Sequence, residues 1–263
     1  MATGAIQFGD AGAYERFMGR WSRAVAPLFL DWLNPPKRAR WLDIGCGSGI
    51  LTEALLDLCD PASVTGIDPS AAQIAAALGG RAAQRARFKA ADAMELPFPD
   101  RSFDNTESAL VINFIADPSP ALAEMRRVTV RGGLVGGYVW DFEKDLSPSG
   151  PLRRAMRAFG AEVPALPGTS HSSLQALESL FRQAGFSAID SRTIDVTLAY
   201  SDFTDFWSAQ TSDYSPTTKV INAMTDAERR RLMRAVQEAV PRAHNGRIEY
   251  TARANAIKAA VTA

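Results

Sequence analysis

The chain has 263 residues, which fits one α/β domain with a small appended subdomain, or at most two domains. The 29 Lys and Arg residues equal the 29 Asp and Glu residues, so the basic excess that is usual for proteins bound to nucleic acid is missing. Two cysteines, Cys46 and Cys59, cannot build a disulfide framework, and we expect reduced thiols. With no signal-like N-terminus and no apolar run of about 18 residues, we expect a cytoplasmic protein without membrane insertion.

The first 140 residues alternate between helical and strand patterns. A helical pattern over Tyr14–Leu33 stops at Asn34-Pro35-Pro36, because proline lacks an amide donor and restrains the residue before it. Further helices are expected at Gly49–Leu58, Pro69–Leu78 and Pro118–Val128. Strands are expected at Arg40–Ile44, Val64–Ile67, Arg87–Lys89, Phe103–Ile112 and Leu134–Trp140, with a turn at Arg131–Gly133 before the last of these. This alternation predicts βαβ units and a parallel sheet.

The last third departs from this alternation. A helix is expected at Leu174–Gly185, followed by an alternating strand at Ile189–Leu198. The helix Thr225–Val240 starts with a capping box, and Arg247–Ile257 is a candidate closing strand. Two long inserts interrupt this order. We therefore predict an α/β core from residues 1–142, 174–201 and 246–263, with residues 1–33 as a helical lid and residues 143–173 and 202–245 as cap inserts.

The strongest local signal is the run Asp43-Ile44-Gly45-Cys46-Gly47-Ser48-Gly49, in which a strand ends in an acid and a glycine-rich turn opens a helix. Glycine allows a ligand to approach the backbone, and the helix start presents free amides. Ile50 stands where the dinucleotide fingerprint needs its third glycine, and the Walker pattern is absent. A tight turn without any ligand remains an alternative.

Two further acids follow predicted strands. Asp68 lies 19 residues after Gly49, where a carboxylate can accept both hydroxyls of a ribose. Asp92 follows the third strand, where it can accept a hydrogen bond from an adenine amino group, with Pro69 and Met94 as apolar faces for the ring. Taken alone, each acid is more often a turn residue. Because both acids follow the glycine turn in order along the chain, the three motifs together favour a ligand that contains a nucleoside.

Together these segments, with Leu96–Asp104 and Glu124–Val128, resemble the class I S-adenosylmethionine-dependent methyltransferases, and within them the small-molecule, ubiquinone-biosynthesis-like type 11 group. The resemblance implies a doubly wound α/β fold with a seven-stranded, mostly parallel sheet whose last strand is antiparallel. It implies S-adenosylmethionine as cofactor and a small-molecule acceptor. The implied cofactor-binding residues are Asp43, Gly45, Cys46, Gly47, Asp68, Pro69, Asp92, Ala93, Ser108 and Ala109.

The resemblance also assigns roles. Gly45, Cys46 and Gly47 would contact the methionine portion in a loop ordered by Asp43, and Asp68 would hold the ribose. Asp92 and Ala93 would bind the adenine, while Ser108 and Ala109 would offer backbone carbonyls to the cofactor's amino group. No catalytic residue and no metal site is implied. One departure lies in Val130-Arg131-Gly132, where the family commonly has a proline before the glycine of the turn.

Direct SN2 transfer from a sulfonium needs mainly proximity and orientation. Asp141, just past the fifth predicted strand, is a candidate general base or substrate contact, although a solvated loop acid is the more common role at such a place. Asn34-Pro35-Pro36-Lys37 is similar to a motif of DNA amino-methylating enzymes, but it precedes the first strand and carries lysine in place of the aromatic residue. A nucleotide-dependent oxidoreductase and a non-catalytic cofactor-binding protein remain alternatives, and the acceptor and oligomeric state stay open.

Overall fold

The computed structural model describes residues 15–166, 168–212, 215–243 and 245–262. Tyr14, the first residue of the expected N-terminal helix, lies outside the described residues. Seven strands form one sheet in the order β3-β2-β1-β4-β5-β7-β6. The strands are β1 (Arg40–Ile44), β2 (Ser63–Asp68), β3 (Arg87–Ala90), β4 (Phe103–Ala109), β5 (Thr129–Trp140), β6 (Phe186–Tyr200) and β7 (Ile248–Val261).

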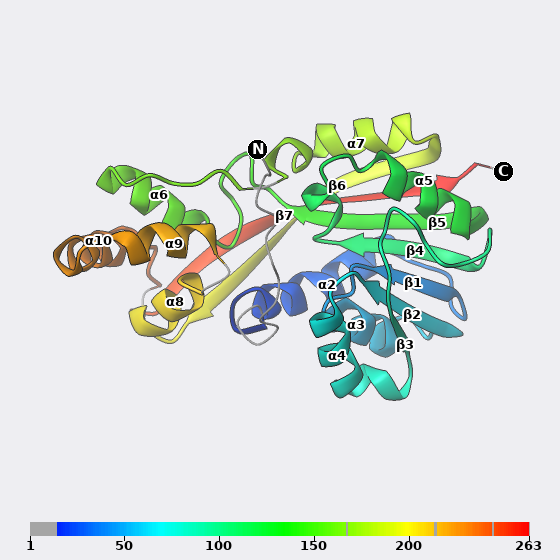
Figure 1. The fold of residues 1–263 in the computed structure, drawn as a ribbon, viewed down its shortest axis with the longest axis horizontal. Helices are drawn as coiled ribbons and strands as arrows, with labels where there is room; N and C mark the ends of the chain where they lie inside the picture. Colours follow the sequence, from blue (N-terminus) through cyan, green and yellow to red (C-terminus); the bar gives the residue numbers. More distant parts are fainter. Residues whose placement is uncertain (1–14, 167, 213–214, 244, 263) are drawn as a thin grey trace.

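Helices cover both faces of the sheet (Figure 1). One face carries α2 (Arg20–Leu33), α3 (Ile50–Leu58) and α4 (Ala71–Gly79), and the other carries α5 (Ser119–Val128) and α7 (Leu174–Gln183). The remaining helices lie at one end of the sheet or in short connections. They are η1 (Glu15–Gly19), η2 (Arg81–Gln84), η3 (Ile112–Phe114), α6 (Gly150–Phe159), η4 (Thr169–His171), α8 (Phe203–Gln210), α9 (Pro216–Ala223) and α10 (Asp226–Ala239).

The direction of the strands confirms the expected doubly wound α/β sheet. β1 to β5 pair in parallel, whereas β7 is antiparallel to both of its neighbours, β5 and β6. Two core clusters lie on opposite faces because side chains alternate along a strand: Trp41 of β1 packs on the α2–α3 side and Leu42 on the α5–α7 side.

Several element boundaries differ from those expected from the sequence. β5 begins at Thr129, so Arg131–Gly133 is part of the strand and not a turn before it; Gly132 has a φ of 73° where the pairing with β4 is irregular. β4 ends at Ala109, because Leu110 takes a left-handed conformation with a φ of 62° and the chain leaves the sheet into η3.

The last two strands are longer than expected, with 15 residues in β6 and 14 in β7. Because β7 is antiparallel to β5 and to β6, β6 runs in the same direction as β5. The insert that follows β6 therefore starts at the same edge of the sheet as the insert that follows β5. From the sequence alone we expect the second insert to start elsewhere and to reach round to that edge; this expectation is wrong, because β6 already ends there.

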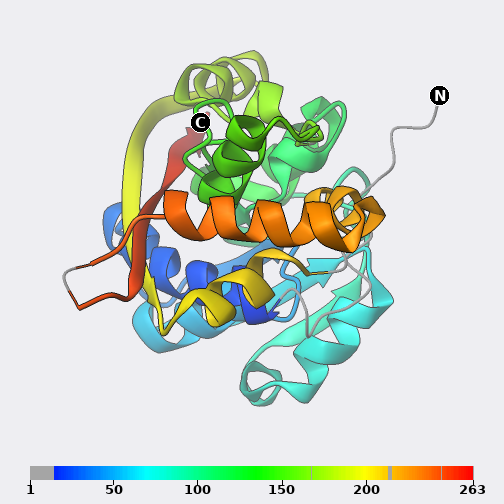
Figure 2. The same ribbon diagram turned by 90° about the vertical axis from the view of Figure 1, so that its left-hand side faces the viewer.

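Both inserts fold into helices that lie beyond the carboxyl ends of the parallel strands (Figures 1 and 2). α6 packs on α10, and their buried residues Met156 and Val236 belong to the same apolar cluster as α2. The capping box at Thr225 forms as expected: Thr225 accepts from the Glu228 amide, and Glu228 accepts from the Thr225 amide. No helix among the described residues is long and apolar enough to cross a membrane.

Candidate active site at the carboxyl edge of the sheet

The glycine turn between β1 and α3 is built by backbone conformations that favour glycine. Gly45, Gly47 and Gly49 have φ values of 71°, 54° and 93°, in the left-handed region. The amides of Gly45 and Cys46 both donate to the carbonyl of Ile67 at the end of β2, at 2.8 and 2.9 Å. The turn is thus fixed to the neighbouring strand and leads directly into the amino end of α3, whose first amides lack helical partners.

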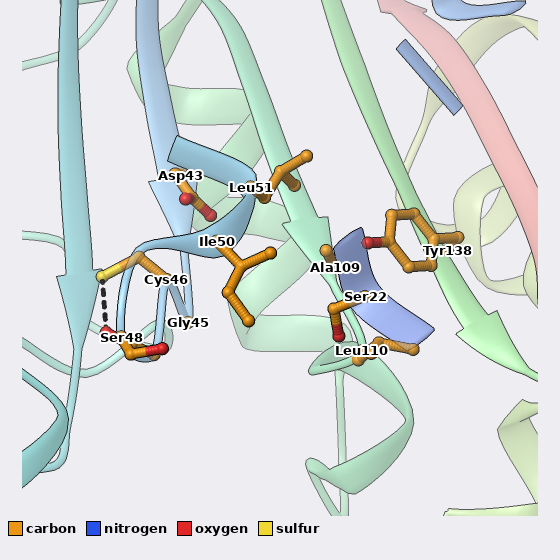
Figure 3. Close-up of a pocket in the computed structure, with 11 residues that line it drawn as sticks. Ser22, Asp43, Gly45, Cys46, Ser48, Ile50, Leu51, Ala109, Leu110 and Tyr138 are labelled. Atoms are coloured by element: carbon orange, nitrogen blue, oxygen red, sulfur yellow. Dashed lines mark hydrogen bonds between the residues drawn. The ribbon is translucent and has the colours of Figure 1, made fainter. Parts of the chain in front are cut away.

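A small cavity lies beside this turn (Figure 3). Ile50 and the glycine turn lie on one side of it, and Ala109, Ser22 and Tyr138 lie on the other. The lining residues are Ser22, Asp43, Gly45, Cys46, Gly47, Ser48, Ile50, Leu51, Ala109, Leu110 and Tyr138.

Asp43 is buried under the turn, with 1% of its surface exposed. Its Oδ2 accepts a hydrogen bond of 2.6 Å from Thr52 Oγ1 in α3, which ties the strand end to the helix. Burial raises the pKa of Asp43 to about 7; the Thr52 bond opposes that rise and the charge of Asp68 adds to it. Asp43 therefore ties the end of β1 to α3 beneath the turn.

Asp68 holds the turn from the end of β2. Its Oδ2 accepts from the Gly47 amide at 3.0 Å and its Oδ1 accepts from the Ser70 amide at 2.8 Å. Partial burial raises the pKa of Asp68, and the two amide bonds oppose the rise. Each carboxylate oxygen keeps a further lone pair for a ligand hydroxyl. Pro69, the next residue, is exposed.

The other predicted site residues are spread along the same edge. Asp92 is exposed, and its Oδ1 accepts from the Met94 amide at 2.9 Å, while Ala93 is buried. Ala109 lines the cavity, whereas the buried Ser108 hydroxyl has no hydrogen-bond partner. The structure thus brings Asp43, Gly45, Cys46, Gly47 and Ala109 together around the cavity and leaves Asp68, Pro69, Asp92, Ala93 and Ser108 outside its lining.

Sequence reasoning did not single out Ser22, Leu110 or Tyr138. Ser22 comes from α2, far away in the sequence, and Tyr138 lies in an apolar run near the end of β5, so neither carries a local signal. Ser48, Ile50 and Leu51 also line the cavity, and their place in the glycine turn and the first helical turn could have indicated them.

Asp141 is not the solvated loop acid that its position suggested. It is 2% exposed, and its Oδ1 accepts from the Lys144 amide at 3.1 Å, which closes the turn after β5. Its backbone is also fixed, because its amide donates to the Arg253 carbonyl and its carbonyl accepts from the Leu146 amide. These contacts give Asp141 a structural role at the base of the first insert.

A second polar cluster ties the inserts to the core. Tyr250 of β7 donates to the Pro148 carbonyl at 2.8 Å, and Gln210 of α8 donates to both the Pro148 carbonyl and the Tyr250 hydroxyl, at 2.9 and 2.8 Å. The indole of Trp21 in α2 donates to Tyr200 of β6, whose hydroxyl lies 3.3 Å from that of Tyr250. These five residues, the tyrosine knot, join α2, both inserts and the last two strands.

Comparisons with known proteins identify relatives of this chain. Residues 42–136 match the family model described as "Methyltransferase domain". The chain is 36% identical to O-methyltransferase cnsE of Penicillium expansum over 164 residues, which are 60% of this chain and 55% of that protein, so it spans about half of that relative's length. It is 30% identical to a demethylmenaquinone methyltransferase of Roseiflexus castenholzii over 183 residues, which are 63% of this chain and 75% of that protein.

Solved structures show the same fold. The YcgJ protein of Bacillus subtilis superimposes with a TM-score of 0.61 at 19% identity, covering 93% of this chain and 99% of that one. A phosphoethanolamine N-methyltransferase of Haemonchus contortus, solved in complex with S-adenosyl-L-methionine, superimposes with a TM-score of 0.57 at 16% identity, covering 100% of this chain and 61% of that one.

Proposed function

Because the chain belongs to the class I S-adenosylmethionine-dependent methyltransferases of the type 11 group, we propose that it methylates a small-molecule acceptor at the cavity beside the glycine turn. The observation that carries this proposal is the turn itself. Its left-handed glycines carry no side chains, so the backbone of the turn is open to close approach at the carboxyl edge of the sheet, beside the carboxylates of Asp43 and Asp68. That edge is where open α/β folds bind their ligands.

The residues present fit S-adenosylmethionine, the methyl donor of the family. A side chain added at Gly47 would meet only Gln73, at 3.7 Å, so the backbone there can be approached closely. The amino end of α3 suits the carboxylate of the methionine portion. Gly45, Cys46, Gly47, Ser108 and Ala109 would hold that portion. Asp68 would hold the ribose, and Pro69, Asp92 and Ala93 would surround the adenine.

The bound donor would supply a sulfonium methyl group for direct displacement by the acceptor. The chain's own contribution is to orient the two molecules and to exclude water, since positioning accounts for most of the acceleration of such transfers. Asp43 and Thr52 keep the turn in one conformation. Asp141 is already engaged in closing a turn, so we assign it no proton transfer.

We extend the proposal to the arrangement of the chain around the site. Residues 1–142, 174–201 and 246–263 would form the core, with residues 1–33 as a lid, of which residues 1–14 lie outside the described part of the chain. The inserts 143–173 and 202–245 would cover the donor. The tyrosine knot supports this division, because it fastens α2 and both inserts to each other at the edge where the glycine turn lies. Ser22 of α2 also lines the cavity.

The acceptor class is supported by what the relatives are named for. They include an O-methyltransferase and enzymes that methylate demethylmenaquinone or 2-methyl-6-phytyl-1,4-hydroquinone. Balanced charge supports the absence of nucleic acid as a partner. The two buried, unpaired thiols Cys46 and Cys59 support a cytoplasmic location, where thiols stay reduced.

Calorimetry with S-adenosylmethionine, S-adenosylhomocysteine and NADH tests the proposal. We expect both methionine-derived ligands to bind and NADH not to bind. Asp68→Ala is expected to weaken binding by about 1–3 kcal/mol, because charge-assisted hydrogen bonds to two hydroxyls are lost. Glu95→Ala, which removes an exposed acid from the loop after β3, serves as the matched control and should bind like the wild type.

Binding of NADH alone would favour the oxidoreductase alternative. Unchanged affinity in Asp68→Ala would mean that Asp68 serves only to fix the turn. Methyl transfer to an acceptor from a panel of hydroquinones and phenols separates an enzyme from a non-catalytic cofactor-binding protein.

A further inference from the structure

A second hollow, of about 370 Å³, lies at the amino edge of the parallel strands. The loop before β4, the carboxyl ends of α5 and β7 and the first residues of β5 meet there. This is the end of the sheet opposite to the one that carries the inserts and the glycine turn (Figure 1). Its volume is in the range of about 300–1,000 Å³ that is typical of small-molecule sites.

Four of the residues that line this hollow are arginines, and one, Asp100, is an acid. Arg127 is fully engaged, because all five of its N–H groups donate hydrogen bonds of 2.7 to 2.9 Å. Its partners are the carboxylates of Asp100 and Glu124 and the carbonyls of Leu96 and Phe98. Arg127 and Asp100 therefore hold the wall of the hollow together.

The other three arginines have no acid partner. Arg101, Arg126 and Arg131 are exposed, and none of them makes an ion pair among the described residues. Arg126 donates to the Ala184 carbonyl at 3.4 Å, which is long for a hydrogen bond. Three guanidinium charges thus surround one hollow in a chain whose net charge is zero.

Three separate elements bring these arginines together. Arg101 precedes β4 and has a left-handed φ of 56°, and its amide donates to the Arg127 carbonyl at 3.0 Å. Arg126 is in the last turn of α5. Arg131 lies in the first part of β5, where the pairing with β4 shifts register.

The dipole of α5 explains only part of this cluster. Cations are favoured in the last turn of a helix, which accounts for Arg126 and Arg127. Arg101 and Arg131 come from a loop and a strand, so the dipole does not account for them. Their charges repel one another and that of Arg126, and a bound anion would remove this repulsion.

We propose that Arg101, Arg126 and Arg131 form a second binding site, separate from the methyl-transfer site, for a small free anion that carries a phosphate or diphosphate group. The planar guanidinium group matches phosphate oxygens with two parallel N–H bonds. Three such groups suit an anion with more than one negative charge. A hollow admits a small molecule, whereas the surface of a membrane is too flat to enter it.

Calorimetry with inorganic diphosphate tests the site at an ionic strength of about 0.15 M, where diffuse attraction to exposed charges is largely screened. We expect one diphosphate to bind to each chain, more tightly than phosphate and far more tightly than acetate. Hydrogen exchange should show that diphosphate protects residues 100–102 and 126–133 and leaves residues 43–50 of the glycine turn unchanged.

Variants identify the binding groups. Arg101→Gln and Arg131→Gln should each weaken diphosphate binding about tenfold or more, because hydrogen bonds between charged groups are lost. Arg131→Lys keeps the charge but loses the planar fork, so its loss should be smaller than that of Arg131→Gln. Unchanged midpoints of urea unfolding would show that the variants fold.

Arg87→Gln is the matched control. Arg87 is an exposed arginine at the start of β3, outside the hollow, and makes no ion pair among the described residues. This variant should bind diphosphate like the wild type.

Absence of diphosphate binding, equal losses in Arg87→Gln and Arg131→Gln, or protection confined to the glycine turn would overturn the inference. Binding to vesicles of phosphatidylglycerol without binding of free diphosphate would also contradict it, because the arginines would then serve a membrane surface.

Discussion

The glycine turn and the tyrosine knot stand at the same edge of one sheet, yet they are built in opposite ways. The turn is local: Asp43, Gly45, Gly47 and Thr52 lie within ten residues and bond to one another or to the next strand. The knot joins groups up to 179 residues apart in the sequence, such as Trp21 and Tyr200. The turn is thus fixed by contacts within one short segment, whereas the knot depends on residues that are distant in the sequence.

Because the glycine turn is held by local backbone conformation, we expect single substitutions in it to lower stability by straining the backbone. Gly45→Ala should cause the largest loss of stability. Its φ of 71° costs alanine about 1–2 kcal/mol, and the added methyl group would collide with Val111, an overpacking that costs about 1–3 kcal/mol more. Urea unfolding measures the sum.

Val111→Ala offers the matched control for that experiment. Combined with Gly45→Ala, it should recover the part of the loss that comes from the collision and leave the part that comes from φ. Full additivity of the two single substitutions would show that the methyl group does not meet Val111.

The turn should also respond to pH through Asp43. A folded pKa of about 7 lies above the unfolded value, so the folded protein holds a proton that the unfolded chain has lost. The contribution of Asp43 to stability is therefore present at acidic pH and is lost as the pH rises toward 7.

Asp43→Asn cannot lose this proton. The variant should become more stable relative to the wild type by about 1.4 kcal/mol for each pH unit between about pH 5 and about pH 7, measured as the difference in urea unfolding free energy without ligand. Ion-paired acids such as Asp104 and Asp195, whose pKa values are lowered by arginine partners, make stability rise with pH in both proteins. Subtracting the unfolding free energy of the wild type from that of the variant removes this shared contribution. A difference independent of pH would contradict the raised pKa.

A substitution in the tyrosine knot should have a smaller effect and a different readout. Tyr250→Phe removes the hydroxyl that links Gln210 and Pro148, and should cost about 1–3 kcal/mol of stability. Thr197→Val is the control, because it removes an exposed hydroxyl that bonds to Thr251 in the same hairpin, and it should cost far less.

Hydrogen exchange should then show faster exchange of α2, α6 and α8 in Tyr250→Phe, with little change at the glycine turn. Equal acceleration of the turn would mean that the two regions unfold as one unit.

The same contrast explains what the sequence could predict. The turn, its flanking strand and helix, and the order of acids after successive strands are all local patterns, and the fold and the family followed from them. Ser22 and Tyr138 could not be found in this way, because they reach the cavity through packing of α2 and β5. Asp141 was misjudged for a related reason: its burial depends on Leu146 and Arg253 folding back over it.

Strand boundaries were mispredicted where side-chain patterns and backbone geometry disagree. Gly132 and Gly133 suggested a turn, but β5 runs through them, and a side chain at Gly133 would meet the Asp104 carbonyl at 2.5 Å. Glycine there allows two strands to approach closely. The strand expected at Phe103–Ile112 does form, as β4, although it ends at Ala109, and its polar run Asn105–Ser108 is buried.

The long pairing of β6 with β7 affects the entropic cost of closing the segment between them. The strands pair from Phe186 with Val261 to Tyr200 with Ile248, so the sheet itself holds the two ends of residues 201–247 together. Closing a loop costs entropy that grows only slowly with length, by about 0.6 kcal/mol for each doubling. This end of the hairpin is therefore a place where we expect the chain to tolerate insertions, deletions or an exchanged helical segment without disturbing the pairing of the two strands.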